Sequence, residues 1–485
     1  MPLSATVPSM EKLVQQKKAK YTADAVDAAR FISGGKIRVG CTVAESGLRL
    51  TVFGRAYALE YPGDDWKKLP DGLKEFLADN IAFLTTAHLP VMLPISRIEY
   101  ETAHPLFKSF FYQCLLENVP FSADMDKKPV AQYMRRFMNA EYAFGDYDIK
   151  MPRQKKPELE DKAVVTFSFG KDSLATYAVL KELGIGCILA NFEEADVPLE
   201  VAHKRRLSSS FEKEFDPIHR VKNEFSLIHD WRHFAVPKTE WGYGHLITEY
   251  CLESVPFAIE NKARYIAFGN EKSCSESYHG AEGFRCYPVF DQTHRWMVQL
   301  STISRMLTGA SVVSVIEPLN DLALMKLLHQ RYPGIAKYQM SCFPDENQRY
   351  STKSRWCGHC SKCARIFIFM KALGISPEKL GFQHDMLQKE FSGYFSIFNA
   401  MADNAVMGWD RSQASKEEQL FAFYLAIRQG AKGQLMDAFR AQFYSDVQER
   451  EDELYKKFFG IHSSITMPPE LKEKVLSIYR EALNE

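Results

Sequence analysis

A six-residue loop in the middle of the chain, Ser168 to Ser173, constrains the fold most. The apolar run Ala163 to Phe167 before the loop is typical of a buried strand, and the residues after it favour a helix. Small and hydroxyl residues at a helix N-terminus form a site for an anion, because backbone N–H groups converge there and the helix dipole adds partial positive charge. Lys171 adds a full charge. The loop therefore predicts a phosphate site and, with it, nucleotide chemistry.

The loop differs from two common phosphate-binding motifs. A Walker A motif ends in Gly-Lys-Ser/Thr, whereas Asp172 follows Lys171 here. A dinucleotide-binding loop needs three spaced glycines, which are absent from this sequence stretch. The pattern Ser-x-Gly-x-Asp-Ser instead resembles the pyrophosphate-binding loop of the N-type ATP pyrophosphatases, with Phe169 in place of the first glycine. A strand-to-helix turn capped by Ser or Asp is the alternative that the pattern leaves open.

Charge and composition limit the class of protein further. The 61 basic and 61 acidic residues cancel, so the chain has little electrostatic attraction for nucleic acid, and we do not expect nucleic acid as a partner. No run of 18 apolar residues predicts a membrane span, and the first twenty residues lack the apolar core of a secretory signal. Ten cysteines, of which six are scattered, fit a reducing compartment. We therefore expect a cytoplasmic protein.

The sequence divides into three regions, in line with roughly 150 residues per domain. Residues 1–157 are expected to form an N-terminal α+β domain to which the sequence assigns no role, ending in a linker, Met151 to Asp161, rich in Pro, Lys and Glu. Residues 158–375 alternate short apolar strands with helices, which predicts a doubly wound, mostly parallel α/β sheet. Residues 376–485 have helical periodicity and are expected to form a C-terminal helical region.

Apolar periodicity predicts the individual elements of these regions. In the N-terminal region we expect a β-hairpin with strands Lys36 to Val43 and Leu48 to Tyr61. In the second region we expect one long helix from His245 to Asn261. The remaining expected elements are strands Val164 to Phe167, Cys187 to Phe192, Phe225 to Ile228, Tyr265 to Phe268 and Val312 to Ile316, and helices Leu73 to Phe83, His104 to Glu117, Leu420 to Ile427 and Leu471 to Leu483.

Four cysteines late in the chain have the spacing of a metal site. Cys357, Cys360 and Cys363 follow the pattern Cys-x-x-Cys-x-x-Cys, and Cys342 lies upstream of them. Four thiolates complete a tetrahedral zinc shell with no position left for water, which is typical of a structural site. His359 could replace one cysteine, although its place between two of them favours a knuckle residue. An iron–sulfur cluster stays open as an alternative, because thiolates hold both.

The loop followed by the cysteine cluster resembles 7-cyano-7-deazaguanine synthase, the N-type ATP pyrophosphatase of the queuosine pathway, over about Ala163 to Leu373. This resemblance implies an adenine nucleotide alpha hydrolase-like fold with a zinc-binding knot. Tyr265 to Glu271 match the strand and turn that build the family's active site, and Glu317 to Leu319 match the Pro-Leu after its last strand. Two positions depart from the family: Leu324 stands where it has a lysine, and Arg365 follows the last cysteine by two residues instead of three.

The resemblance also implies a reaction. ATP is cleaved between its α and β phosphates while a substrate carboxylate, expected to be 7-carboxy-7-deazaguanine, becomes an acyl-adenylate. Ammonia or another amine then displaces AMP and gives an amide, which the synthase activates again and dehydrates to a nitrile. Magnesium and the loop stabilise the pyrophosphate that leaves. Enlarged relatives occur in bacterial antiphage operons, so a role in antiviral defence, a protein partner and a homodimer are all compatible with the chain.

The resemblance and the predicted strand ends together assign the site residues. Lys171, Asp172 and Ser173 receive catalytic roles. Asn191 and Glu193 follow a strand where such folds recognise the nucleoside, with helix capping as the alternative, and Asn270 and Glu271 either line the acceptor site or form a turn. The predicted nucleotide-binding set is Ser168, Phe169, Gly170, Lys171, Asp172, Ser173, Asn191, Glu193, Gly269, Asn270 and Glu271, and the predicted zinc ligands are Cys342, Cys357, Cys360 and Cys363.

Two other functions remain open from the sequence. A tRNA-modifying enzyme of the same fold would thiolate a base with an iron–sulfur cluster, although zero net charge and the order of the cysteines count against it. A non-catalytic assembly subunit could have kept a nucleotide-binding fold, and Leu324 in place of the family's lysine favours that alternative.

Overall fold

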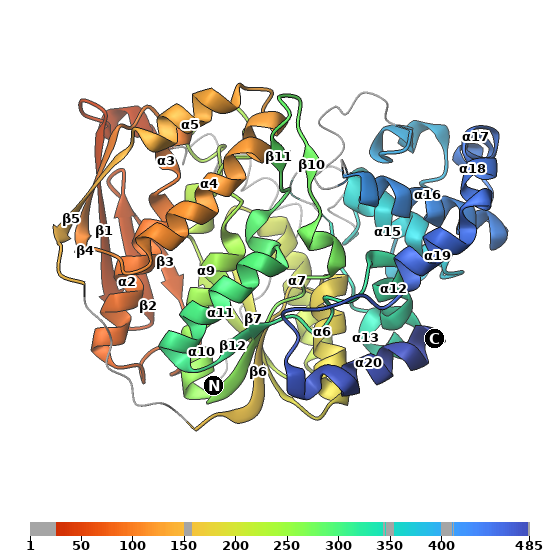
Figure 1. Ribbon diagram of the computed structural model, residues 1–485. Helices are drawn as coiled ribbons and strands as arrows, with labels where there is room; N and C mark the ends of the chain where they lie inside the picture. The colour runs from red at the N-terminus through yellow and green to blue at the C-terminus, as the bar shows by residue number, and fades with distance from the viewer. Residues whose placement is uncertain are drawn as a thin grey trace.

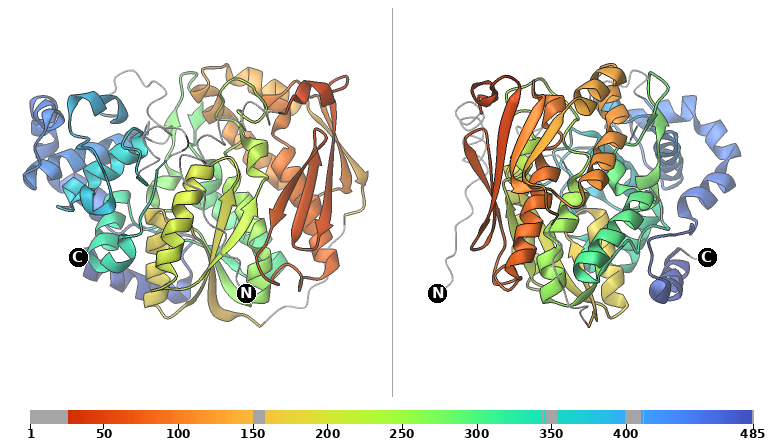
Figure 2. Two further views of the ribbon diagram at one scale, coloured as in Figure 1. Left: turned by 180° about the vertical axis from the view of Figure 1, so that it is seen from behind. Right: turned by 60° about the vertical axis from the view of Figure 1, so that its left-hand side comes forward.

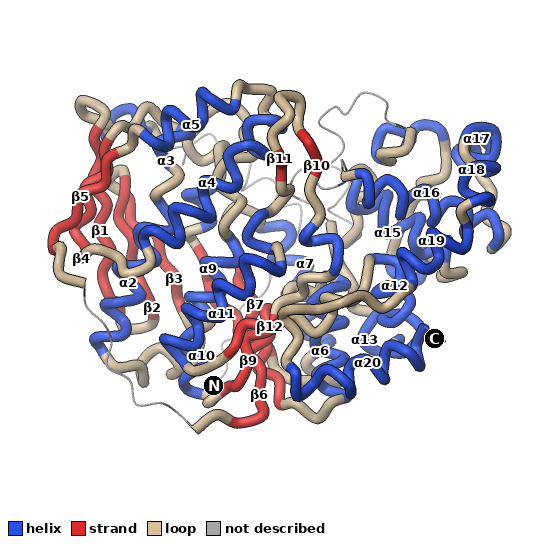
Figure 3. Tube along the Cα trace, in the orientation of Figure 1, coloured by secondary structure: helices blue, strands red, loops and turns tan. Residues whose placement is uncertain are grey.

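The computed structural model describes residues 26–149, 158–342, 345, 354–398, 410 and 412–483. A ten-stranded sheet runs through the molecule, and the C-terminal helices lie at the side opposite the N-terminal strands (Figure 1). Figure 3 shows the strands in one continuous series flanked by helices. The strands of this sheet are β1 (Lys36–Ala44), β2 (Gly47–Val52), β3 (Arg55–Glu60), β4 (Arg97–Ala103), β5 (Glu141–Asp146), β6 (Glu160–Thr166), β7 (Gly186–Glu194), β8 (Ile218–Asn223), β9 (Ala263–Ala267) and β12 (Ser311–Val313).

The helices pack on both faces of this sheet (Figure 2). A separate two-stranded ribbon is formed by β10 (Tyr278–His279) and β11 (Arg285–Cys286). The α-helices are α2 (Asp71–Thr86), α3 (Leu89–Met92), α4 (Lys108–Met125), α5 (Val130–Met138), α6 (Lys171–Glu182), α7 (Pro198–Phe211), α8 (Ser226–His229), α9 (Leu246–Glu253), α10 (Val255–Glu260), α11 (His294–Thr308), α12 (Asp321–Lys326), α13 (Pro333–Ala336), α15 (Ser361–Ala372), α16 (Gln413–Arg428), α17 (Gln434–Gln442), α18 (Tyr444–Glu449), α19 (Glu451–Phe459) and α20 (Pro469–Leu483).

The strand order is β12-β9-β6-β7-β8-β3-β2-β1-β4-β5. The five strands of the second region, from β12 to β8, are all parallel, as are β1, β4 and β5, whereas β1, β2, β3 and β8 join through antiparallel pairs. The predicted α/β class, mostly parallel sheet and helical C-terminus are therefore confirmed. Strand order reverses between β6 and β9, and ligands of open α/β sheets bind outside the carboxyl ends of strands at such a reversal.

Two hydrophobic cores lie on the two faces of the sheet and cross the regional boundaries. Successive residues of β6 alternate between the cores, as side chains of a strand must: Ala163 and Val165 join one core, and Val164 joins the other. The first core also takes in the C-terminal helices, down to Leu483. The second core takes in the N-terminal strands and α2. The N-terminal region also joins the central sheet through the pairing of β3 with β8, so each terminal region shares a core with the central one.

Three predicted strands are wrong in detail. The predicted strand Val312 to Ile316 is β12, Ser311–Val313, so its last three residues lie outside the strand. The predicted strand Leu48 to Tyr61 is two strands, β2 and β3, because the chain turns at Phe53 and Gly54, both at positive φ. Phe225 to Ile228 is not a strand: its last three residues lie in the short helix α8, and the preceding strand β8 is more polar than the sequence argument expects. Asn223 ends that strand, since its side chain accepts a hydrogen bond from the Phe225 amide at 2.9 Å.

The predicted helix His245 to Asn261 is divided into α9 and α10 at Ser254. Pro256 has no amide hydrogen to continue the helical bonding, so a new helix begins at Val255, with the proline in its first turn. The other predicted helices are present, and α20 begins at Pro469. Most of the predicted linker, residues 150–157, lies outside the described residues. Within the described ranges no helix combines the length and the apolar character needed to cross a lipid bilayer.

Candidate functional site

The loop between β6 and α6 is held in a strained conformation by apolar and backbone contacts. Phe169 has φ of 61°, a left-handed value that favours glycine, and this explains why a glycine is expected at the position. Its ring is fully buried, with the ring centroids of Phe167 and Phe211 at 4.9 and 5.7 Å. The Met340 amide donates to the Phe169 carbonyl at 2.8 Å. The aromatic packing and this bond fix the loop next to the segment that carries the first cysteine.

The N-terminus of α6 lacks a side-chain cap. Gly170 is the N-cap residue, and no side chain caps the first turn of this twelve-residue helix. Ser173 Oγ accepts from the Ser168 amide at 3.2 Å and donates to the Gly170 carbonyl at 3.2 Å, while Ser168 itself is exposed. A Cβ atom on Gly269, just after β9, would lie 2.7 Å from Asp172 Cβ, so only glycine fits there. The reversal of strand order thus brings an uncapped helix terminus and two hydroxyl groups together.

Lys171 lies at the centre of a set of buried ion pairs. Its Nζ is 2.6 Å from Asp172 Oδ1 and 2.7 Å from Asp321 Oδ1. Burial alone would lower the pKa of Lys171, but Asp172, Asp321 and Glu271 raise it above its ordinary value, so the amine stays charged. The lysine assigned to phosphate binding is therefore already paired, and a phosphate would have to compete with or join these carboxylates.

Asp321 and Arg365 extend this set toward the C-terminal region. Asp321, the first residue of α12, is fully buried and accepts from Arg365 Nη1 at 2.9 Å through Oδ2. Arg365 Nη2 contacts Asp410 and donates to Ser415 Oγ at 2.9 Å. We call Asp172, Lys171, Asp321, Arg365 and Asp410 the ion-pair network. Sequence reasoning does not assign Asp321, although a carboxylate that opens a helix after the last strand is a usable signal.

Glu271 adds a carboxyl group with a raised pKa. It is 3% exposed, and it accepts hydrogen bonds from the amide and the hydroxyl of Ser273, both at 2.5 Å. Burial, followed by the charge of Asp321, raises the pKa of Glu271 to about 8, and Lys171 opposes the rise. Glu271 is therefore mostly neutral at pH 7, which limits the negative charge beside the loop.

Three other predicted residues have partners within the fold. Asn191 is buried and donates through Nδ2 to the Phe167 carbonyl at 2.7 Å, so it fixes the end of β6. Glu193 makes a bidentate ion pair with Arg205 of α7. Asn270 is buried and donates to the Gln292 carbonyl at 2.9 Å. None of the three caps a helix in these contacts; Asn191 supports the loop from behind.

Neither Leu324 nor Lys326, two residues further on, takes the place of the family's lysine beside the loop. Leu324 is fully buried in the core of α12. Lys326 Nζ instead donates to the Leu483 carbonyl at 3.3 Å and lies over the Phe459 ring. Lys326 therefore contacts the C-terminal helices rather than the loop.

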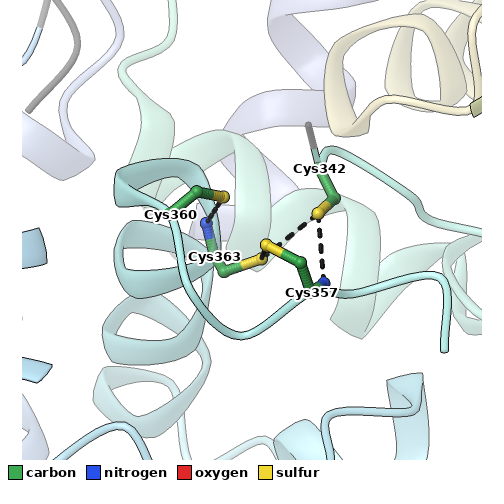
Figure 4. Close-up of side chains that lie close together, drawn as sticks. All are labelled: Cys342, Cys357, Cys360 and Cys363. Carbon is green, nitrogen blue, oxygen red and sulfur yellow. Dashed lines mark hydrogen bonds between the residues drawn. The ribbon is translucent and has the colours of Figure 1, made fainter. Parts of the chain in front are cut away.

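The four predicted zinc ligands converge (Figure 4). All four are buried, and the sulfur atoms of Cys363 and Cys342 are 3.5 Å apart, those of Cys357 and Cys363 3.8 Å. Sulfur atoms about 2.3 Å from one tetrahedral zinc ion lie about 3.8 Å from each other, so this spacing fits zinc. The distances are too long for a disulfide. The cluster could hold a metal such as zinc, in agreement with the sequence.

Backbone amides complete the surroundings of the sulfur atoms. The Cys357 amide donates to Cys342 Sγ at 3.2 Å, and the Cys363 amide to Cys360 Sγ at 3.4 Å. His359 donates through its amide to Cys357 Sγ at 3.3 Å, so it is the expected knuckle residue rather than a ligand. Hydrogen bonds from the other three thiols lower the pKa of Cys360 well below its ordinary value, whereas burial raises the pKa of Cys342 and of Cys363. Cys360 is therefore the thiol of the cluster that most favours the thiolate, the form that binds a metal ion.

The metal-ligating groups near the loop differ from the cysteine cluster. Among the described residues, two groups of three or more His, Cys, Asp or Glu side chains come close enough to hold an ion, the cysteine cluster and a set of three histidines. Asp172 and Asp321 are carboxylates of the kind that bind magnesium with one or two protein ligands and substrate phosphates. Both carboxylates pair with Lys171, and neither belongs to the two groups of converging ligand atoms among the described residues.

Comparisons with known proteins leave the family open. No family model, no curated protein sequence and no solved structure matches the chain. The fold and the two clusters are therefore interpreted from their own geometry.

Proposed function

We propose that the protein activates a substrate carboxylate with ATP and joins the resulting acyl-adenylate to ammonia or an amine. The observation that carries the proposal is the uncapped N-terminus of α6 with Ser168, Ser173 and Lys171, placed where strand order reverses between β6 and β9. Anions bind at uncapped helix termini, and nucleotides bind at such reversals. The loop pattern, Ser-x-Gly-x-Asp-Ser, favours pyrophosphate over a terminal phosphate as the group that is bound.

In this proposal each loop residue stabilises a different part of the negative charge on the nucleotide. Backbone amides at the start of α6 and the exposed Ser168 hydroxyl would bind the pyrophosphate that leaves. Lys171 would stay charged beside Asp172 and Asp321 and turn toward the phosphates, exchanging one carboxylate for a phosphate oxygen. Magnesium, held by Asp172 and phosphate oxygens, would neutralise further charge. The nucleophile is the substrate carboxylate, so no side chain has to form a covalent bond.

For the substrate, we propose 7-carboxy-7-deazaguanine, with an amide or nitrile as product. The matches at Tyr265 to Glu271 and at Glu317 to Leu319 support this choice. Glu271 adds a physical argument, because a mostly neutral carboxyl group at pH 7 does not repel an anionic acid as an ionised one would. A function in the cytoplasm and in antiviral defence, with a protein amine as acceptor, belongs to the same proposal.

The test is release of AMP and pyrophosphate from ATP in the presence of 7-carboxy-7-deazaguanine, with and without ammonia. Lys171→Met should lower kcat about 10²–10³-fold, the usual effect of removing one group that stabilises developing charge. Lys181→Met is the matched control on the same helix, since Lys181 is 45% exposed and pairs with Asp216. No turnover by the wild-type protein with this acid would reject the substrate. Equal turnover by both variants would reject the role of the loop.

An assembly subunit without catalysis is the second candidate, and the paired state of Lys171 favours it. In that case the ion-pair network would hold the fold together and no nucleotide would be cleaved. Asp172→Ala separates the two functions. Retained biological activity with intact folding would support the assembly function, and its loss would support catalysis. For the third function, base thiolation, iron and sulfide in the cysteine cluster would be required, and one zinc ion there would reject it.

A further inference from the structure

A second buried cluster lies apart from the cysteines and the loop. His88, between α2 and α3, faces His229 at the end of α8 and His245 just before α9. The ring centroids are 5.0 Å apart for His88 and His229, 5.2 Å for His88 and His245, and 4.7 Å for His229 and His245. Glu249 of α9 places Oε1 3.1 Å from His229 Nε2 and 3.3 Å from His245 Nε2. We call these four residues the histidine cluster.

The histidine cluster is excluded from solvent. His88, His229, His245 and Glu249 each have a relative exposure of 0%. Polar groups buried in this way cost free energy unless they are paired, and nearly all of them in folded proteins have a partner. The three buried imidazoles therefore need hydrogen-bond partners or a bound ion inside the fold.

Several nitrogen atoms of the cluster have no hydrogen-bond partner. Within the described part of the chain, the Nδ1 atoms of His88, His229 and His245 accept or donate no hydrogen bond, and neither does His245 Nε2. The Oε1 atom of Glu249 also lacks bonding geometry, although two imidazole nitrogens lie within 3.3 Å of it. A buried polar atom without a hydrogen bond destabilises the fold, and each of the three rings contains at least one such atom. Three buried rings that lie close together and carry nitrogen atoms without hydrogen-bond partners are an arrangement that a cation can satisfy.

We propose that the histidine cluster binds a zinc-type divalent ion through the three imidazoles, and that the Glu249 carboxylate, which pairs with two of them, turns to supply the fourth ligand. One ligand atom from each histidine lies within 4.8 Å of the others. Nitrogen atoms at about 2.0–2.1 Å from a tetrahedral ion lie about 3.4 Å apart, so the imidazoles would move closer together when the ion binds. The three nitrogens supply three of the four positions that zinc prefers, and Glu249, 3.1 Å from His229 Nε2 and 3.3 Å from His245 Nε2, is placed to supply the fourth. Because all four side chains are buried, such a site would be structural.

The ligands come from two regions of the chain, so a bound ion would link them. His88 comes from the N-terminal region, and its carbonyl accepts from Trp241 Nε1 at 2.7 Å. His229, His245 and Glu249 come from the second region. A bound ion would thus join the two regions on the face of the sheet that carries the second core, whereas the cysteine cluster joins the loop to the C-terminal helices.

The first test counts and characterises zinc in the full-length protein after expression with added zinc. We expect two zinc ions per chain. Zinc X-ray absorption should show a nitrogen or oxygen shell at about 2.0–2.1 Å and a sulfur shell at about 2.3 Å in equal proportion. One ion per chain with a sulfur shell alone would overturn the proposal. This measurement needs no variant, so it stands even where a substitution in the cluster prevents folding.

The second test uses variants in pairs. His245→Asn should lower the zinc content from two ions to one and leave the sulfur shell unchanged, whereas Cys357→Ser with Cys360→Ser should leave one ion with the nitrogen and oxygen shell. His279→Asn, at an exposed histidine of β10, is the matched control and should keep both ions. A zinc content of two in soluble His245→Asn would overturn the assignment. The result is independent of nucleotide cleavage, so it does not depend on the proposed function.

Discussion

Two buried polar clusters of this protein solve the same physical problem in opposite ways. The ion-pair network beside the first core balances its charges with one another: Lys171 lies between Asp172 and Asp321, and Arg365 lies between Asp321 and Asp410. Among the described residues Asp321 Oδ1 and Asp410 Oδ2 of this network accept no hydrogen bond, but both carboxylates belong to ion pairs. The histidine cluster beside the second core instead leaves four imidazole nitrogens of the described structure without hydrogen-bond partners. The difference shows that burial of polar groups is sustained either by internal pairing or by a bound ion, and each alternative predicts a different response to perturbation.

The largest expected effect is the loss of a charge from the self-balanced cluster. Asp321→Asn leaves Lys171 and Arg365 with one buried carboxylate fewer, and breaking a buried pair in this way costs about 3–5 kcal/mol of the free energy of unfolding. Urea unfolding measures it. Asp437→Asn is the control, because Asp437 forms an exposed pair with Arg440 that contributes about 0–1 kcal/mol. Equal costs for the two variants would contradict the view of the network as self-balanced.

The second prediction concerns metal removal and tests the other side of the comparison. If the histidine cluster depends on an ion, chelation should destabilise the protein even in Cys357→Ser with Cys360→Ser, where the cysteine cluster is disabled. Free zinc at about 100–1000 times its Kd stabilises a folded protein by about 3–4 kcal/mol, so a shift of that size is expected on chelation. Thermal unfolding with and without chelator measures it. If chelator does not change the thermal unfolding of the Cys357→Ser, Cys360→Ser variant, the histidine cluster does not depend on an ion.

The same comparison explains what the sequence can predict. Three of the cysteines lie within seven consecutive residues, and the loop occupies six, so local spacing is enough to find both. The three histidines extend from His88 to His245 and come from two regions that the pairing of β3 with β8 brings together, so no local spacing reveals them. Asp321 escapes the sequence argument for a related reason, since its partner Lys171 is 150 positions away in the chain and on another element.

The elements of the fold are predictable within the same limits. The parallel strands that are rich in apolar residues are located correctly, because continuous burial leaves a continuous pattern. Strand β8 is missed, since only Ile218, Val221 and Asn223 of its six residues are buried and its partner β3 belongs to another region. The short apolar run after it is predicted as a strand, and periodicity cannot separate such a run from one helical turn.

The third prediction concerns a buried hydrogen bond between uncharged groups, which belongs to neither cluster. Asn191→Ala removes the bond from Nδ2 to the buried Phe167 carbonyl, 2.7 Å long, and leaves that carbonyl without this donor at the end of β6. We expect a loss of about 1–3 kcal/mol in stability and weaker nucleotide binding, because the loop begins at the next residue. Asn261→Ala is matched, since Asn261 makes the same type of bond to Phe257 at 2.9 Å in a half-buried place. Equal losses in nucleotide binding would show that Asn191 does not position the loop.

The smallest expected effect is a pH dependence that comes from Glu271. Its pKa of about 8 in the folded protein exceeds the ordinary value of 4.5, because of burial and the nearby charge of Asp321. Between these pH values the folded protein binds more protons at this position than the unfolded chain does. The contribution to stability is therefore complete below pH 4.5 and falls as pH rises toward 8.

Glu271→Gln should remove that part of the slope, which urea unfolding at several pH values would measure. The control is Glu453→Gln, because Glu453 is exposed and its pKa is lowered by a hydrogen bond from Arg450, so any slope that it contributes has the opposite sign. An unchanged slope in Glu271→Gln would show that the loop region balances its charge without a neutral carboxyl group. The ion-pair network would then extend to Glu271, and internal pairing would account for every buried carboxylate beside the loop.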